Sequence, residues 1–359
     1  MAKLSASLRD PGSPVDNSDM PFQWKRRDLL RIGAAVLAAG MLAPRAEASS
    51  LFGRMFAVPA RDTSYFTPND KFYIVNYSDS PFSVSRDLNA DQWQLAITGA
   101  VKKTVILRYP DILKRPAIEQ AVTLECIDNL PGGDSMGTAM WRGISLKALL
   151  EEMGADKDTA RDVVFRAADG YDDSITFERA MRGDVLLAYM MNGARLPKAH
   201  GYPLRAVVPG IFGIKNVKWI SEIEVYEGDY KGYWQRKGWT DDGTIKITSR
   251  IDSPGHYQVL RGKEHLFKGI AYGGPETIKK VEISFDAGRT WNNAPFELPL
   301  SSYTWVIWYY NWAPPKAGTY QVSVRAIDVK GHVQTSEIIR PQPAGASGLH
   351  TIVALVDQL

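Results

Sequence analysis

A strand-like run leads directly to the single cysteine of this 359-residue chain, Cys126. Residues 121–124 favour an extended strand, and residues 128–134 contain the Asp, Asn, Pro and Gly residues typical of turns. We therefore expect Cys126 to lie where a strand opens into a loop, a place from which a thiol can reach a cofactor. An internal disulfide is excluded, because the chain has no second cysteine. A free cysteine can also act simply as a small buried hydrophobic residue.

The N-terminal segment has the features of an export signal. The basic run Lys25–Arg31 contains the pair Arg26 and Arg27, the uncharged apolar stretch Ile32–Leu42 follows, and Ala46–Ala48 resembles a cleavage site. We predict a twin-arginine signal peptide over 1–48 and a periplasmic location. The apolar stretch is too short for a stable membrane span. Because this route carries folded proteins, it suggests a cofactor inserted before export.

The composition limits the class of protein. Hydrophobic residues make up 45% and charged residues 23%, as in a soluble globular protein. After residue 48 the chain has 36 basic and 35 acidic residues. This near-neutral balance argues against a nucleic-acid partner, which would need a basic face. The length exceeds that of one compact core, so we expect two folded domains.

The pattern over 49–243 predicts an α+β domain. We expect one amphipathic helix over Ile144–Met153, with Gly154 as its stop signal. The expected strands form a mixed sheet, and Asn192-Gly193 marks a hairpin turn. These strands cover 71–77, 93–98, 162–167, 184–191, 202–208 and 217–226.

The pattern over 244–342 predicts a second domain. Short alternating strands separated by turn signals, without a helical stretch, are typical of an immunoglobulin-like β-sandwich. We expect strands over 278–285, 303–312 and 318–326, and a C-terminal tail over 343–359. The polar stretch Gly238–Gly243 is the expected linker, and it can also cover the site of the first domain.

The residue types allow a cofactor that brings its own metal ligands. A thiolate is a soft ligand, and the five histidines show no metal-ligand spacing, which disfavours a zinc or iron site made by protein alone. Gly210 and Gly213 permit close approach of the backbone to a ligand. Arg205, Lys215 and Lys218 supply positive charge for a phosphate-bearing organic cofactor. A surface loop with solvated lysines would give the same pattern.

Taken together, the motifs make the chain resemble the sulfite oxidase family of molybdenum–molybdopterin oxidoreductases. The resemblance covers about Thr67 to Gln334. In the first domain it is carried by Thr123–Asn129, Trp141–Leu146, Leu187–Gly193, His200–Gly210 and Val217–Trp219. In the second domain it is carried by Val281–Ser284, Gly288–Trp291 and Trp305–Trp308.

The resemblance implies a molybdopterin-binding catalytic domain followed by a dimerisation domain. It implies that Cys126 is the protein's molybdenum ligand. The second domain would form a homodimer, and no haem domain of the family is recognised, so electrons would pass to a separate carrier such as a c-type cytochrome. Contacts to the pterin cofactor are implied for Tyr73, Asn76, Tyr77, Asp169, His200, Arg205, Asn216 and Lys218, to which the charge pattern adds Lys215.

The chain departs from the family pattern at positions linked to sulfite. Sulfite-oxidising members carry arginine where this chain has Val75, Pro131 and Val306, and a tyrosine where it has Trp239. A desolvated dianion needs paired positive charge. We therefore expect oxygen-atom transfer on a small substrate other than sulfite, with Cys126, Trp239 and the retained Arg236 as catalytic residues.

Three alternatives remain open at this point. The first is a true sulfite dehydrogenase whose anion site is rebuilt from residues such as Arg142 or Arg236. The second is a cofactor-free binding protein on an old enzyme scaffold. The third is a hydrolase that uses Cys126 with His200, although no acid or amide is placed to orient that histidine.

Overall fold

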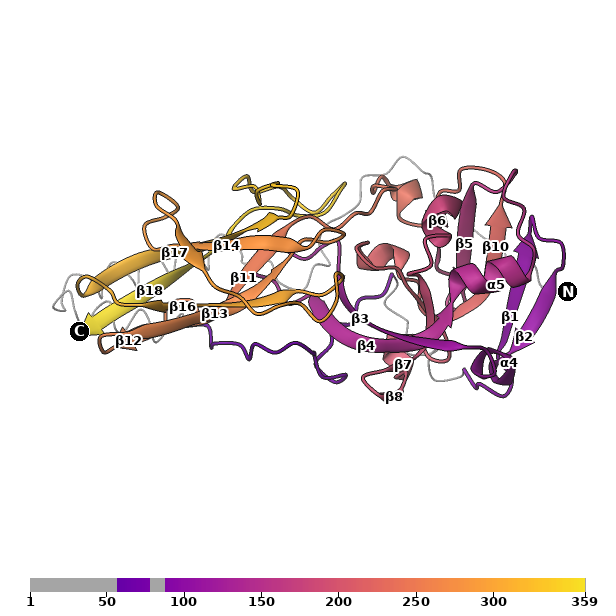
Figure 1. The fold of residues 1–359 in the computed structure, drawn as a ribbon, viewed down its shortest axis with the longest axis horizontal. Helices are drawn as coiled ribbons and strands as arrows, with labels where there is room; N and C mark the ends of the chain where they lie inside the picture. Colours follow the sequence, from indigo (N-terminus) through magenta and orange to yellow (C-terminus); the bar gives the residue numbers. More distant parts are fainter. Residues whose placement is uncertain (1–56, 78–87, 359) are drawn as a thin grey trace, which may run out of the picture. The chain divides into compact units, whose positions relative to one another are not determined.

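The computed structural model describes residues 57–77 and 88–358, which all belong to one compact unit. The predicted signal peptide over 1–48 lies outside these residues. Among the described residues, no helix combines the length and apolar composition needed to cross a membrane. The α+β class is confirmed, because short helices accompany extensive sheets (Figure 1).

The first domain contains two sheets where the sequence predicted one. The first sheet is mixed, since β1 pairs with β10 in parallel and its other pairs are antiparallel. Its order is β2 (Val105–Arg108), β1 (Gln94–Gly99), β10 (Ile220–Tyr226), β5 (Asp162–Ala167) and β6 (Asp172–Thr176). The second sheet is antiparallel. Its order is β3 (Ala117–Glu125), β4 (Met136–Ser145), β7 (Leu186–Met191) and β8 (Ala194–Arg195), with β9 (Arg205–Val207) also on β7.

The helices of the first domain are short. The predicted amphipathic helix is present as α5 (Leu146–Glu152), and its start is fixed by Ser145, whose hydroxyl accepts from the Ala148 amide at 3.3 Å. Leu149 and Leu150 are buried in the main core of the domain. The other helical segments are α4 (Tyr109–Leu113), α6 (Phe177–Ala180) and the 3₁₀ turns η2 (Lys198–His200), η3 (Gly213–Lys215) and η4 (Gln235–Lys237).

Two further predictions from the sequence have opposite outcomes. The predicted hairpin at Asn192-Gly193 is confirmed, with φ angles of 50° and 73° that suit the turn between β7 and β8. The predicted strand over residues 71–77 is wrong, because this segment pairs with no strand. Phe72 instead packs edge-on against Trp141, so its apolar pattern reflects burial against the second sheet.

The second domain is the predicted β-sandwich. One sheet has the order β11 (Thr248–Ser253), β13 (His265–Tyr272) and β16 (Val306–Trp312). The facing sheet has the order β12 (Val259–Arg261), β18 (His350–Gln358), β17 (Gly318–Asp328), β14 (Ile278–Ser284) and β15 (Asn292–Ala294). The side chains of Val322, Val324 and Ala326 alternate into the core between them.

The expected C-terminal tail over 343–359 is wrong. Residues His350–Gln358 form β18, which lies between β12 and β17 in the sheet. Ile352, Ala354 and Val356 are buried in the sandwich core. The second domain therefore continues well beyond residue 342.

Candidate functional site

Cys126 is placed by the β3–β4 hairpin. It follows the last residue of β3, and its amide donates to the Ser135 carbonyl at 2.8 Å, which closes the loop 126–135. Inside this loop the Asn129 side chain donates to the Glu125 carboxylate at 2.8 Å and accepts from the Ser135 amide at 3.0 Å. The strand end predicted for the thiol is therefore confirmed. Cys126 is 6% exposed and lies at the wall of a pocket.

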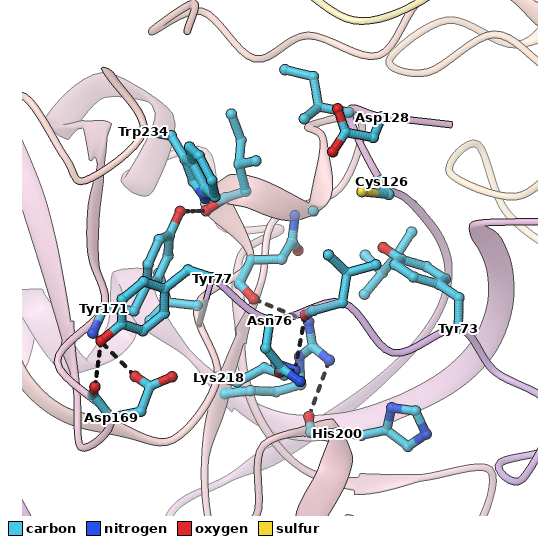
Figure 2. Close-up of a pocket in the computed structure, with 18 of the residues that line it drawn as sticks. Tyr73, Asn76, Tyr77, Cys126, Asp128, Asp169, Tyr171, His200, Lys218 and Trp234 are labelled. Atoms are coloured by element: carbon cyan, nitrogen blue, oxygen red, sulfur yellow. Dashed lines mark hydrogen bonds between the residues drawn. The ribbon is translucent and has the colours of Figure 1, made fainter. Parts of the chain in front are cut away.

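The pocket draws its lining from several segments that are distant in sequence (Figure 2). Cys126 and Asp128 come from the β3–β4 loop, and Asp169 and Tyr171 come from the β5–β6 connection. Most of the residues predicted to contact a cofactor lie together here. They are Tyr73, Asn76, Tyr77, Cys126, Asp169, His200, Arg205, Asn216 and Lys218, and Trp239 joins them.

One end of the pocket is cationic. Figure 2 shows His200 and Lys218 at the end away from Cys126 and Asp128. The Arg205 guanidinium is buried and donates to the carbonyls of Ala206, His200 and Asn216 at 3.0–3.2 Å. The Lys218 ammonium donates to the side-chain oxygen of Asn76 and to the Val75 carbonyl at 3.2 Å. Neither cation forms an ion pair with a described carboxylate, so this end can accept an anion.

The pKa shifts follow from burial and from this charge pair. Burial and the nearby Arg205 lower the pKa of Lys218 to about 7, and burial lowers the pKa of Arg205 to about 10. Burial also lowers the pKa of His200 to about 4, so its imidazole is neutral and donates from Nε2 to the Asn69 carbonyl at 2.9 Å. A bound anion would reduce the electrostatic repulsion between Arg205 and Lys218.

The thiol is not activated for nucleophilic attack. Burial raises the pKa of Cys126 to about 11, and the charges of Asp128 and Glu125 add to the rise. His200 lies at the other end of the pocket and donates to a backbone carbonyl. These facts oppose a hydrolase built on Cys126 and His200, which would need a hydrogen bond between the two side chains.

The residues fit a cofactor that brings its own metal. A Cβ atom added at Gly213 would lie 2.9 Å from the Tyr73 hydroxyl and 3.8 Å from the Cys126 Cα atom, so only glycine leaves this wall open. Among residues 57–77 and 88–358, no cluster of three His, Cys, Asp or Glu side chains could hold a metal alone. One thiolate and an anion-binding end suit a metal that arrives on a phosphate-bearing cofactor.

Two predicted site residues lie elsewhere. Lys215 ends η3 and turns away from the pocket, because its ammonium donates to Asp173 at 3.0 Å and to Asp241 at 2.8 Å. Arg236 is exposed and pairs with Asp172 at 3.0 Å, outside the pocket lining. The assignments of Lys215 to cofactor binding and of Arg236 to catalysis are therefore corrected.

Of the four departures from the sulfite-linked pattern, two lie in the pocket and two lie elsewhere. Val75 and Trp239 line the pocket. Val306 is buried in the core of the second domain, and Pro131 lines a small separate cavity beside Glu125. Only Val75 and Trp239 can therefore act on a substrate directly.

Sequence reasoning left several lining residues unassigned, among them Asp128, Tyr171 and Trp234. Asp128 follows the cysteine by two residues in the turn, and Trp234 opens the retained motif that ends at Arg236, so both had a usable signal. Tyr171 carried no local signal, because its ring reaches the pocket only through tertiary packing. The rings of Tyr77 and Tyr233 lie 4.8 Å apart, and the chain of aromatic contacts continues through Trp234 to Trp239. Tyr77, Trp234 and Trp239 of this chain of contacts line the pocket and form its aromatic wall.

Comparison with known proteins matches both domains. Residues 82–234 match the model of the oxidoreductase molybdopterin binding domain, and residues 242–342 match the Mo-co oxidoreductase dimerisation domain. The mitochondrial sulfite oxidase of Rattus norvegicus is 30% identical over 322 residues, covering 77% of this chain and 58% of that protein. The sulfite oxidase of Arabidopsis thaliana is 29% identical over 333 residues, covering 77% and 84%.

A solved structure has the same fold. The sulfane dehydrogenase SoxCD from Paracoccus pantotrophus aligns with a TM-score of 0.71 at 23% identity, covering 81% of this chain and 82% of that one. The chain spans somewhat over half the length of the animal sulfite oxidases that it matches. The domain matches and these relatives indicate a molybdenum–molybdopterin cofactor. The chain belongs to the sulfite oxidase family of molybdenum–molybdopterin oxidoreductases.

Proposed function

We propose that this protein catalyses a two-electron oxygen-atom transfer on a small uncharged substrate and is not an efficient sulfite oxidase. The observation that carries the proposal is the charge pattern of the pocket. Among the described lining residues, the basic side chains are His200, Arg205 and Lys218. His200 and Lys218 lie at the end away from Cys126, and Arg205 donates to the His200 carbonyl. Beside Cys126 the lining instead includes the carboxylate of Asp128. A dianion placed beside Cys126 would have no cation to pair with, and burying an unpaired charge costs free energy.

The proposal gives a role to four residues of the pocket. The molybdenum centre, when bound, supplies the oxygen-atom chemistry. Cys126 would give its thiolate to the metal, and coordination would overcome the raised pKa of the thiol. Arg205 and Lys218 would hold the cofactor's phosphate through charge-assisted hydrogen bonds. Burial keeps the Tyr73 phenol protonated, so it can donate a hydrogen bond near Cys126.

The aromatic side chains would bound the substrate space. Val75 presents apolar surface where a sulfite site would present an arginine, and Trp239 adds an aromatic ring where such a site would present a tyrosine. Trp234 contacts Trp239 with ring centroids 6.1 Å apart and extends the same wall. This wall excludes water and favours a neutral or partly apolar molecule, such as a sulfoxide, an N-oxide or an uncharged sulfane-sulfur compound.

The proposal also covers the setting of the enzyme. The signal pattern over 1–48 supports export to the periplasm in the folded state. The match of 242–342 to a dimerisation domain supports a homodimer through the second domain. Electrons would be exchanged with a separate carrier such as a c-type cytochrome.

Steady-state kinetics on fully metallated protein tests the substrate class. With sulfite and an artificial one-electron acceptor, kcat/KM should lie far below roughly 10⁴ M⁻¹s⁻¹. That threshold is the lower end of the range typical of enzymes acting on their own substrates. Val75→Arg should raise the sulfite kcat/KM at least tenfold, because it adds a cation to the pocket lining. Val329→Arg is the matched control and should change nothing, since Val329 is exposed in the second domain and is not part of this lining. Efficient turnover of sulfite by the natural protein would overturn the proposal.

A further inference from the structure

The loop that carries Cys126 is held by two arginines that lie far from it in the sequence. The Gly132 carbonyl accepts from Arg61 Nη1 at 2.8 Å, and the Gly133 carbonyl accepts from Arg250 Nη1 at 2.8 Å. Arg250 lies in β11 of the second domain, and Arg61 lies in the segment that precedes β1 in the sequence. Two arginines therefore hold adjacent carbonyls of one loop.

The Arg250 side chain is fixed before it meets the loop. It is 8% exposed, and its Nε donates to the 2% exposed Asp252 at 2.6 Å. Asp252 also binds the segment that carries Arg61, because its carbonyl accepts from the Arg61 amide at 2.7 Å and its carboxylate accepts from Thr63 at 3.3 Å. Asp252 thus holds the Arg250 side chain through its carboxylate and the Arg61 backbone through its carbonyl.

A histidine of the second domain completes the contact. Gly132 has φ +81°, and a Cβ atom placed there would lie 2.2 Å from Cδ2 of His350. The His350 ring is itself oriented by the Ile251 amide, which donates to its Nδ1 at 2.9 Å. The ring therefore packs directly against the backbone of the loop and leaves no space for a side chain at Gly132.

We infer that Arg61, Arg250 and His350 form a clamp that positions the Cys126 sulfur from the second-domain side of the loop. The loop transmits the position, because the Cys126 amide and the Ser135 carbonyl close it at 2.8 Å and the clamp holds the residues between them. The second domain then has a role at the metal ligand as well as any role in dimerisation. The inference rests on Cys126 as the ligand of the proposed function, and it does not depend on the substrate.

The single cysteine provides a direct readout in cofactor-free protein. Because the chain has no other thiol, the rate of modification by a maleimide reports only on Cys126. Arg250→Met keeps the apolar stem and removes the hydrogen bonds, so we expect modification at least tenfold faster than in the natural protein. Arg250→Lys should recover part of the protection. Arg325→Met is the matched control, because Arg325 pairs with Glu282 at 2.7 Å within the second domain and should leave the rate unchanged.

Urea dependence separates a loosened loop from a less stable protein. A local opening exposes little surface, so its rate should be nearly independent of low urea concentrations. If the faster modification follows the full urea dependence of global unfolding, the residue is merely structural and the inference is overturned. A natural rate in Arg250→Met would overturn it equally.

A second variant and a second signal keep the test decisive. Should Arg250→Met fail to fold, Arg61→Met is used, because Arg61 is only partly buried and its loss removes one carbonyl contact. In metal-loaded protein at matched molybdenum content, the clamp variants should shift the Mo(V) paramagnetic resonance signal, and Arg325→Met should not. If Cys126→Ser leaves that signal unchanged, the ligand assignment fails, whereas the thiol experiment still judges the clamp.

Discussion

The guanidinium of Arg205 donates to the backbone carbonyl of Asn216 over 3.0 Å and so ties β9 to the segment that carries Lys218. The Asn216 side chain in turn accepts from the Val208 amide at 2.7 Å and donates to the Ile211 and Phe212 carbonyls at 3.0 Å. The cationic end of the pocket is therefore a rigid backbone structure whose two charges have different duties. Arg205 donates to three buried carbonyls, whereas the carbonyls that accept from Lys218, those of Val75 and Ala199, are exposed or only partly buried.

This difference predicts opposite effects on stability. In cofactor-free protein, Arg205→Met should lower the free energy of unfolding, because each buried carbonyl left without a donor costs about 1–3 kcal/mol. Lys218→Met should leave stability unchanged or raise it, because it removes a buried cation. Urea denaturation of both variants measures this. Equal losses in the two variants would contradict the separate roles.

The same two residues should govern cofactor content. A charge-assisted hydrogen bond to phosphate contributes about 1.5–3 kcal/mol, so Lys218→Met alone should weaken cofactor retention at least tenfold. Pterin content per folded protein, measured after purification, checks the result. Arg205→Ala combined with Lys218→Ala should be almost free of pterin. A double variant with full pterin content would place the phosphate elsewhere.

The lowered pKa of Lys218 predicts a pH effect with a definite sign. The folded state releases this proton near pH 7, whereas the unfolded state keeps it to about pH 10.5. Between these values the unfolded state holds more protons, so the contribution of Lys218 to stability rises with pH, by at most about 1.4 kcal/mol per unit. Urea unfolding of cofactor-free protein at several pH values should show this slope. Lys218→Met should lack it, and an unchanged slope in the variant would refute the assignment.

Cys126→Ser should remove the metal's sulfur ligand and preserve the fold. Oxygen-atom transfer should be abolished and the electronic spectrum of the metal should change, since a hydroxyl is a harder ligand than a thiolate. The thermal midpoint of the cofactor-free variant should stay within a few degrees of the natural protein. Full activity in this variant would show that the ligand lies elsewhere.

Lys215 gives a prediction that separates it from Lys218. Its removal leaves the buried Asp173 carboxylate without this cationic partner, so Lys215→Met should lower the free energy of unfolding by about 3–5 kcal/mol. Pterin content per folded molecule should not change. Lys231→Met is the control, because Lys231 also pairs with Asp241 but is exposed, and such pairs contribute at most about 1 kcal/mol. A selective loss of pterin in Lys215→Met would show instead that Lys215 belongs to the cofactor site.

The contrast between Lys215 and Lys218 shows which features of the site could be predicted from the sequence. Cys126 was predictable because local strand and turn signals place it, and the hairpin at Asn192 was predictable because the turn needs positive φ angles. The direction of Lys215 was not, since its partner Asp173 lies 42 residues away and only the folded chain brings them together. The strand over residues 350–358 was readable from its alternation, and taking it for a tail was an error of interpretation.

The order in which the sheet of β12, β18, β17, β14 and β15 is synthesised has a consequence for biogenesis. β18 leaves the ribosome after every other strand of this sheet, yet it lies between β12 and β17. Until β18 has emerged, β17 lacks one neighbour and β12 has none, so the sheet cannot close before that point. His350, which opens β18 and packs against Gly132, reaches the Cys126 loop only then. The Cys126 loop therefore acquires its His350 contact only after all other strands of this sheet have been made.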